Sequence, residues 1–350
     1  MKNHKLVWVL SLMVLTLLSS CKKEPVISAD MNDQFYVRRG GSDMPVRVVG
    51  NGSSNVFVLL LHGGPGDGSL KYRNHPFSDA LEKDYAIAYW DQRHQGNSHG
   101  HLSESDITIE AMVEDTYAVI QTLKQRYGND ISVFLMGHSW GGLLGTAYMV
   151  TKNYQHEVKG WIESAGAHDY PLMNKSMITM VQEIAPEEIT KGNHVEKWEE
   201  ILGYVNELDP NDVTPEQATK LNSYAYQCEG MIEELGSKST SSLGSVQQAF
   251  LTSDNPITTF ANKAQMPEKL TLSILETSLT DELYKIQVPT LMLWGKYDFA
   301  VPSAIAEEAL LNIGTPNKAL KIYEESGHSS MRYQPEEFVT DVKAFIEANK

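Results

Sequence analysis

The chain has 350 residues, of which 41% are apolar and 21% are charged, so it can bury a large hydrophobic core. This composition excludes a disordered chain, a collagen-like repeat and a small disulfide scaffold. Because 29 Lys and Arg stand against 45 Asp and Glu, the net charge is −16, and we expect no nucleic-acid partner. The two cysteines, Cys21 and Cys228, lack the clustered spacing of a zinc site. The sequence carries no metal, nucleotide or flavin signature, so we expect no cofactor.

Residues 1–20 have the pattern of a secretory signal peptide. Two lysines precede an apolar run of 13 residues, Leu6 to Leu18, which is too short to span a membrane as a helix. The following Leu18-Ser19-Ser20-Cys21 resembles the bacterial lipobox. It predicts that Cys21 is acylated and that its lipid holds the protein at a membrane of the bacterial cell envelope. The alternative is an ordinary cleaved signal peptide with an incidental cysteine. Residues 21–33 are predicted to form a tether.

From Gln34 onward, short β-rich runs alternate with helical stretches, which is typical of an α/β fold with a mostly parallel sheet covered on both faces. We predict eight strands, the first two as an antiparallel pair: Gln34–Arg38, Val46–Val49, Val56–Leu61, Tyr85–Trp90, Ile131–Met136, Val158–Ile162, Val288–Trp294 and Leu320–Tyr323. Helices are expected at about 108–126, 141–152, 302–312 and 335–348. The core is therefore predicted in two parts, residues 34–166 and 286–350.

Between the two parts of the core, residues 167–285 are predicted to form an inserted helical cap. Strand-like runs disappear there, and apolar residues recur at helical spacing, as in Leu221, Ala225 and Cys228. Residues 170–285 contain eight lysines, no arginine and eighteen acids, a net charge of −10. This charge indicates either a solvated helical surface or a lid that favours cationic substrates.

Ser139 is the candidate nucleophile. The predicted strand Ile131–Met136 runs into Gly137-His138-Ser139-Trp140-Gly141-Gly142 and then into an apolar helix, the strand–turn–helix context of a nucleophile elbow. Gly137 and Gly141 remove the Cβ atoms that would collide where the backbone bends sharply. The serine hydroxyl is then exposed at the start of the helix. A glycine-rich turn with an idle serine is the alternative.

A serine hydroxyl is a weak nucleophile at neutral pH, so it needs a histidine base and an acid that orients this base. In a fold of this kind the acid and then the histidine follow late strands. Asp298 follows the predicted strand Val288–Trp294, and His328 follows Leu320–Tyr323. We therefore predict a Ser139, Asp298 and His328 triad, with a loop-capping Asp and a surface His as the alternatives.

A second glycine-rich stretch, His62-Gly63-Gly64-Pro65-Gly66, ends the third predicted strand. Bare backbone there can approach a substrate oxygen and offer an amide hydrogen, which would form half of an oxyanion hole. The other half would be the amide of Trp140, directly after the nucleophile. A simple tight turn is the alternative interpretation of this stretch.

At this point the chain resembles the alpha/beta-hydrolase superfamily, and more narrowly the prolyl iminopeptidase family. His62–Gly66 is similar to that family's HGGPG loop, Trp90–Ser98 to its WDQRGxGxS segment, and Gly137–Gly141 to its nucleophile elbow. The resemblance implies that an N-terminal residue, often proline, is cleaved from short peptides. It also implies that the amides of Gly64 and Trp140 form the oxyanion hole.

The same resemblance assigns roles to residues outside the triad. Asp91 and Arg93 would be structural, and a carboxylate of the cap would hold the substrate's α-amine. The nearest match to the family's Trp-Glu-Gly stretch is Cys228-Glu229-Gly230, so Glu229 is the candidate, with an ordinary exposed helical Glu as the alternative. Two departures are visible: Phe299 stands where members of the family carry a second Glu, and His94 replaces a glycine.

The leading functional prediction is a metal-independent serine aminopeptidase that acts on a small peptide. The close alternative uses the same residues on an ester, lactone or amide without a free amine, a small-molecule substrate that would fit the missing second carboxylate. Fold alone does not separate these activities. A non-catalytic binding or sensor protein is the third possibility.

Overall fold

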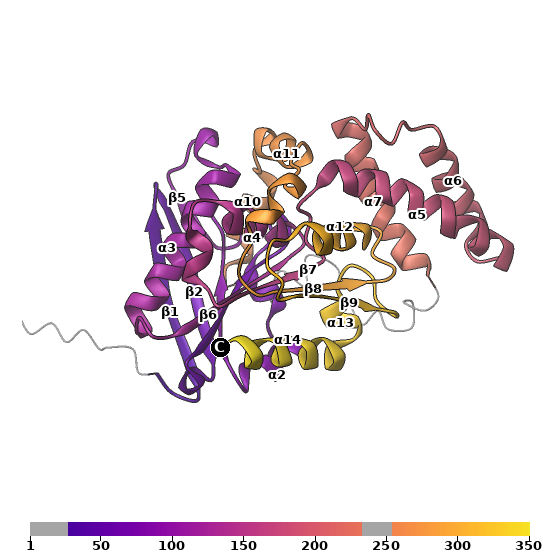
Figure 1. Cartoon of the computed structure of the whole chain (residues 1–350). Coiled ribbons are helices and arrows are strands. Elements are labelled where there is room, and N and C mark those ends of the chain that lie inside the picture. Colours follow the sequence, from indigo (N-terminus) through magenta and orange to yellow (C-terminus); the bar gives the residue numbers. More distant parts are fainter. Residues whose placement is uncertain (1–26, 233–253) are drawn as a thin grey trace, which may run out of the picture.

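The computed structural model describes residues 27–232 and 254–350. These residues form one sheet of nine strands with helices on both faces, and a further group of helices stands away from the sheet (Figure 1). The strands follow the spatial order β1-β2-β4-β3-β6-β7-β8-β9, with β5 paired to β2. Their bounds are β1 Met31–Arg39, β2 Ser42–Gly50, β3 Val56–Leu61, β4 Ala86–Trp90, β5 His99–Gly100, β6 Ser132–His138, β7 Gly160–Ser164, β8 Thr290–Gly295 and β9 Lys318–Tyr323. The predicted α/β class is confirmed.

Parallel pairing brings the loops with the predicted site residues to one edge of the sheet. In the register of β3 and β6, Leu61 lies opposite Gly137, so the loop after β3 leaves beside the turn after β6. In the register of β8 and β9, Gly295 lies opposite Tyr323, so these two strands also end together. Ligand sites of such sheets form outside the carboxyl ends of the strands.

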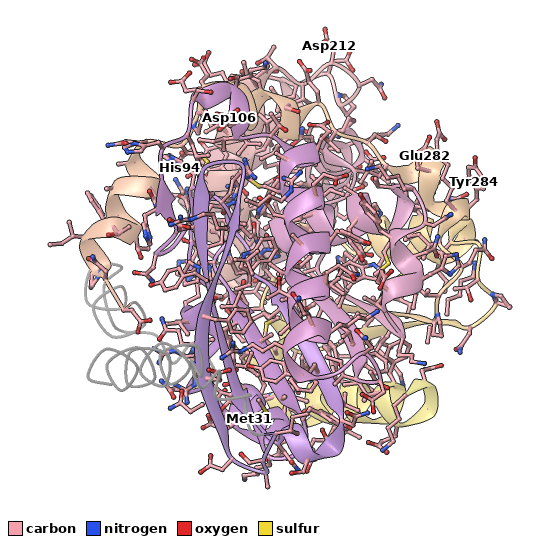
Figure 2. The ribbon with its side chains drawn as sticks, turned by 90° about the vertical axis from the view of Figure 1, so that its left-hand side faces the viewer. Met31, His94, Asp106, Asp212, Glu282 and Tyr284 are labelled. Atoms are coloured by element: carbon pink, nitrogen blue, oxygen red, sulfur yellow. The ribbon has the colours of Figure 1, made fainter. Side chains whose placement is uncertain are left out.

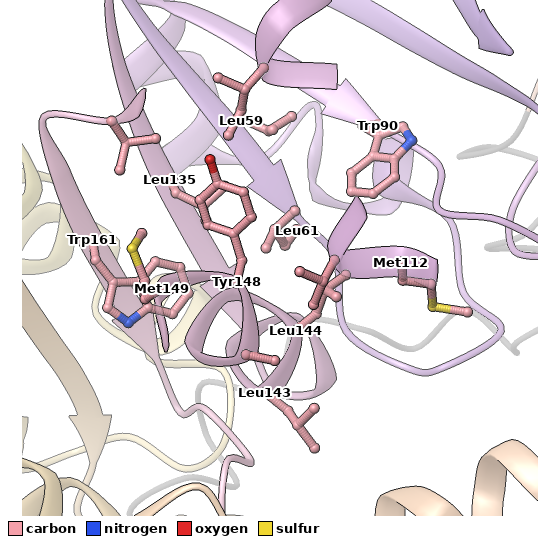
Figure 3. Close-up of a cluster of buried hydrophobic side chains, with 14 of the residues drawn as sticks. Leu59, Leu61, Trp90, Met112, Leu135, Leu143, Leu144, Tyr148, Met149 and Trp161 are labelled. Carbon is pink, nitrogen blue, oxygen red and sulfur yellow. The ribbon is translucent and has the colours of Figure 1, made fainter. Parts of the chain in front are cut away.

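Helices cover the sheet in two layers (Figure 1). One layer contains α2 (Pro76–Glu82) and α14 (Pro335–Asn349), and the other contains α3 (Ile109–Tyr127), α4 (Trp140–Val150) and α12 (Ala304–Asn312). All residues of β3, β4, β7 and β8 are buried, which explains why β3, β4 and β8 are almost continuously apolar. Figure 3 shows Leu144 and Tyr148 of α4 among the buried side chains Leu61 and Leu135 of the sheet. This packing fixes the helix that begins directly after Ser139.

The helical cap is inserted between β7 and β8. Its described helices are α5 (Tyr170–Lys191), α6 (Val195–Asn206), α7 (Pro215–Met231), α10 (Pro256–Ala264) and α11 (Glu268–Leu275). The predicted apolar positions Leu221, Ala225 and Cys228 are buried in the cap's own hydrophobic core. Asp169 joins the two ends of the cap, because it forms a β-bridge with Ser278 that closes the insertion at its base.

The structure differs from the predicted elements at several points. The two-residue strand β5 pairs with β2 as a ninth strand and has no apolar run that would mark it. The short helices α2 and α13 (Ser330–Tyr333) were not predicted. β1 begins at Met31, so the last three residues of the predicted tether belong to the sheet.

Figure 2 shows Met31 at one end of the molecule and Asp212 of the cap at the opposite end. His94 lies nearer to the end with Asp212 than to the end with Met31. The predicted signal peptide and Cys21 fall outside the described residues. Within residues 27–232 and 254–350, no helix is both long and apolar enough to cross a membrane.

Candidate active site

Ser139 lies at a sharp turn between β6 and α4, with the backbone angles φ 58° and ψ −123°. A positive φ is costly for a residue other than glycine, and such strain is concentrated at functional sites. The neighbouring glycines make the turn possible. A Cβ on Gly137 would lie 2.3 Å from the carbonyl oxygen of Gly141, and a Cβ on Gly141 would lie 2.0 Å from that of Leu61. The elbow predicted from the sequence therefore has the backbone geometry that its glycines require.

The loop after β7 holds the backbone of Ser139 from the other side. The amide of Ser139 donates to the carbonyl of Ser164 at 3.1 Å, and the amide of Ala167 donates to the carbonyl of Ser139 at 3.1 Å. The ends of this loop are joined by a buried pair, in which Nδ1 of His168 lies 2.7 Å from Oε1 of Glu163. Burial lowers the pKa of His168, but the neighbouring Glu163 carboxylate outweighs it, and the pKa is raised. Sequence reasoning missed this pair; a charged residue inside the buried strand β7 was the available signal.

Asp298 and His328 form a pair at the cavity that Ser139 lines: His328 also lines this cavity, and Asp298 lies behind His328. Nδ1 of His328 lies 3.0 Å from Oδ2 and 3.1 Å from Oδ1 of Asp298, and both side chains are buried. The amide of Val301 donates to Oδ1 of Asp298 at 2.7 Å and fixes the carboxylate. Burial opposes a charge on His328, but Asp298 outweighs it and raises the pKa of the imidazole. With Nδ1 engaged, Nε2 is the nitrogen available for proton transfer.

His138 of the elbow connects His328 to the glycine-rich loop. Because a carbonyl oxygen only accepts, Nε2 of His138 donates to the carbonyl of His328 at 2.8 Å. Burial lowers the pKa of His138 well below its usual value, so the ring is neutral and its Nδ1 accepts from the hydroxyl of Tyr72 at 2.8 Å. The amide of Gly63 in turn donates to the hydroxyl oxygen of Tyr72 at 2.9 Å. This chain ties the position of the base to the loop after β3.

Gly64 and Trp140 are the two residues whose amides are predicted to form the oxyanion hole. Gly64 follows β3 and lines the cavity together with Ser139. Its φ of 138° is a conformation that favours glycine. Trp140 is the first residue of α4, so its amide is one of the helix's initial donors that have no partner within the helix. The indole of Trp140 donates to Oε1 of Gln92 at 2.7 Å, which holds the start of α4 against the loop after β4.

The loop after β4 has the structural role predicted for it. The carboxylate of Asp91 accepts hydrogen bonds from the amides of Ser69 and Asn97, each at 2.7 Å. Arg93 makes a two-point ion pair with Asp115, with N–O distances of 2.6 and 2.7 Å. Neither charged side chain lines the cavity. The hydrogen bonds of Asp91 and the ion pair of Arg93 therefore stabilise the conformation of the loop, and neither side chain is placed to contact a substrate.

His94 occupies a position that suits glycine, since its φ is 56°. Its ring lies against the cap, where Nε2 donates to the carbonyl of Gln265 at 3.1 Å. A second contact also joins the cap to the core: Lys263 of α10 forms an ion pair of 3.0 Å with Asp67, which directly follows the glycine-rich stretch His62–Gly66. The departure from the family pattern at His94 therefore fastens the cap to the core.

A cavity of about 360 Å³ lies between the core and the cap. Ser139, His328 and Gly64 line it from the core side, and residues of α5, α7 and α11 line it from the cap side. Its volume falls in the range of pockets that bind small molecules, about 300–1,000 Å³. Among the described residues, no group of three His, Cys, Asp or Glu side chains has the arrangement of a metal site.

Glu229 is buried at the back of His328. Only 6% of the residue is exposed, and its Oε2 accepts a hydrogen bond of 3.1 Å from the amide of His328. Oε1 is buried and has no hydrogen-bond partner among the residues that the structure describes. Burial, and then repulsion by Asp298, raises the pKa of Glu229 to about 8. The exposed-surface alternative for Glu229 is thus wrong, although Glu229 itself is not among the residues that line the cavity.

Sheet order, elbow and the buried Asp–His pair together define an α/β-hydrolase. A family model described as serine aminopeptidase, S33, matches residues 52–335, and the chain belongs to this family. Two proline iminopeptidases confirm the resemblance to that family which the motifs predicted. The proline iminopeptidase of Saccharolobus solfataricus is 27% identical over 318 residues, which cover 90% of this chain and 92% of the relative. The proline iminopeptidase of Thermoplasma volcanium is 28% identical over 318 residues, with coverages of 90% and 96%.

Solved structures show the same fold. The crystal structure of proline iminopeptidase from Mycobacterium smegmatis matches with a TM-score of 0.61 at 16% identity, and the match covers 91% of this chain and 98% of that one. The chain is therefore a hydrolase similar to prolyl iminopeptidases in both sequence and fold.

Proposed function

We propose that this protein is a metal-independent serine aminopeptidase that releases the N-terminal residue of a small peptide. The observation that carries the proposal is the buried Asp298 and His328 pair, whose imidazole lines the same cavity as Ser139 at the elbow. Nucleophile, base and orienting acid are the three parts that acyl transfer through a serine requires.

In the proposed reaction, Oγ of Ser139 attacks the scissile carbonyl carbon while Nε2 of His328 takes the hydroxyl proton. The amides of Gly64 and Trp140 donate to the oxyanion that forms. His328 then gives the proton to the leaving amine, the C–N bond breaks, and the N-terminal residue remains as an ester on Ser139. A water molecule, deprotonated by His328, attacks this ester, and the residue leaves as a free acid while Ser139 regains its proton.

Glu229 is the proposed anchor for the substrate's α-ammonium group. A buried carboxylate with an unpartnered oxygen is unstable as an anion, and a cation beside it would stabilise the charge. Its hydrogen bond to the amide of His328 places it next to the catalytic base. The anchor role requires the ammonium to reach Oε1 from the cavity, past Tyr226, whose ring lies 5.9 Å from that of His328.

The second candidate is hydrolysis of an ester, lactone or amide that has no free amine. It is supported by the cavity itself, because none of the described residues that line it is an Asp or Glu. It is also supported by Phe299, an apolar residue at the position of the family's second carboxylate. The same triad would serve both reactions.

The experiment that tests both candidates compares initial rates of the mature domain on aminoacyl arylamides, on the same compounds N-acetylated, and on simple aryl esters. Preference for the free amine supports the aminopeptidase, and cleavage of esters alone supports the second candidate. Ser139→Ala is expected to abolish all hydrolysis. Glu229→Gln is expected to slow the amine-bearing substrates much more than a neutral ester, and equal losses on both would contradict the anchor role.

We also propose, from the sequence alone, that Cys21 carries a lipid that holds the protein at a membrane of the bacterial cell envelope. Growth with a radiolabelled fatty acid tests this proposal, since the label should enter the wild-type protein and be absent from Cys21→Ala.

A further inference from the structure

The cap side of the cavity is almost free of charge. Among the described residues that line the cavity, Lys263 is the one charged side chain besides His328. Its ammonium group is already paired with Asp67 at 3.0 Å. The wall from α5 consists of residues at positions i, i+3, i+4 and i+7, which lie on one face of the helix: Tyr170, Met173, Asn174 and Met177. A substrate group in contact with this wall therefore meets a neutral and largely apolar surface.

Asn174 is the polar exception within the wall of α5. It is only 8% exposed, yet it lines the cavity. Its side chain forms no hydrogen bond with another described residue, whereas a buried Asn in an ordinary core is satisfied by the protein. The carboxamide of Asn174 is open to the cavity rather than sealed in the protein, so its hydrogen bonds are completed by water or by a substrate group that displaces this water.

A structural role does not explain Asn174. It lies inside α5, five residues after the capping residue Asp169, whose own side chain accepts the hydrogen bond of the helix start. Asn is also a poorer helix former than Ala or Leu, which would suit an apolar wall better. The residue is thus unfavourable for the helix and without a partner in the described chain, while it faces the space that a substrate would occupy.

We propose that Asn174 determines specificity for the acyl side of the substrate, and that it binds a neutral carboxamide at the end of an apolar stem, as in an N-terminal glutamine residue. A carboxamide is the best partner because it donates and accepts, as Asn174 does. A carboxylate of the same shape only accepts, and it would bring an unpaired charge to a neutral wall. A purely apolar side chain would leave Asn174 unsatisfied. This inference rests on the proposed hydrolysis through Ser139.

The test compares glutaminyl, methionyl and glutamyl arylamides, whose side chains have similar lengths. Wild-type kcat/KM should be highest for the glutaminyl compound and lowest for the glutamyl one. In Asn174→Leu the ratio of the glutaminyl to the methionyl rate should fall about tenfold, the loss expected for one or two hydrogen bonds. Retained cleavage of the methionyl compound shows that the variant is folded.

The matched control is Asn222→Leu, since Asn222 of α7 lines the same cavity but is exposed to solvent. Its glutaminyl to methionyl ratio should stay within twofold of the wild-type value. An unchanged ratio in Asn174→Leu, or an equal fall in both variants, would overturn the proposal.

Binding separates this inference from the proposed reaction. In the Ser139→Ala background, glutamine amide should bind about tenfold more tightly than methionine amide, and Asn174→Leu should remove the difference. If the wild-type protein cleaves none of the arylamides but this difference in binding is present, the proposed reaction fails and the subsite stands. If the two amides bind equally, the subsite fails whatever the enzyme cleaves.

Discussion

Replacing Glu229 by Gln should make the protein more stable at alkaline pH, although the residue lies beside His328. In the unfolded chain a Glu titrates near 4.5, but in the folded protein burial and the neighbouring Asp298 raise the pKa of Glu229 to about 8. Between these values the folded state binds more protons than the unfolded state, so the carboxyl lowers stability as the pH rises. At 1.36 kcal/mol per pH unit, the full loss amounts to roughly 5 kcal/mol.

Urea unfolding of wild type and Glu229→Gln at pH 5, 7 and 9 measures this effect. The two proteins should differ least at pH 5, and the variant should gain several kcal/mol relative to wild type by pH 9. Asp298, His328 and the backbone of Phe299 act on Glu229, and Glu229 in turn acts on Tyr226, Tyr333 and Cys228; both proteins retain all of these groups.

Glu188→Gln is the control of opposite sign. Glu188 is also a buried cap carboxylate, but its ion pair with Lys191 outweighs burial and lowers its pKa. Its contribution to stability is present above the usual Glu pKa and lost as the pH falls through the lowered value, so the variant should lose stability at neutral pH. A difference between Glu229→Gln and wild type that does not change with pH would refute the reasoning about Glu229.

Gly141→Ala should lower the free energy of unfolding in urea by about 3 kcal/mol or more, because the new Cβ would lie 2.0 Å from the carbonyl oxygen of Leu61. In the control Gly203→Ala, the new Cβ on α6 meets open space, and the free energy of unfolding should rise by about 0.5–1 kcal/mol. Glu163→Ala should cost about 3–5 kcal/mol by the same assay, since it leaves His168 buried without its partner; a loss below 1 kcal/mol would show that the pair is not needed. EDTA should leave the hydrolytic rate unchanged, and a reproducible loss that added metal restores would contradict the metal-independent mechanism.

The parts of the site that the sequence predicted are those whose constraints are local or follow chain order. The Ser139 turn is specified by glycines two positions away on either side, so the strand, turn and helix can be recognised within a short window. Asp298 and His328 lie far apart in the sequence, but each directly follows a strand of a sheet whose order is known for the fold. Parallel pairing of β8 and β9 then suffices to bring them together.

The parts that the sequence did not predict depend on which side chains meet across the fold. The Glu163 and His168 pair spans only five residues, but apolar periodicity does not reveal it, because the contact depends on the course of the loop after β7. The position of Glu229 was left open between cleft and solvent, since a residue beside an apolar helical stripe can face either way. Asn174 gave no signal, because a single Asn in a helix is common on exposed surfaces.

The distribution of charge in the cap bears on how the enzyme would select an amine. The acidic residues that give the cap its net negative charge are absent from the described wall of the cavity, and Asp212 lies at the outer end of the cap (Figure 2). Exposed charges act through water and are screened over about 10 Å at ordinary salt, whereas a buried charge acts in a medium of much lower dielectric constant. In the proposed anchor role, Glu229 would lose its proton beside a bound ammonium group, and this one carboxylate behind His328 would then have more influence on the ammonium than the many acids of the surface. Selection of a free amine would be decided at Glu229, and the outer charge would act only on the approach of the substrate.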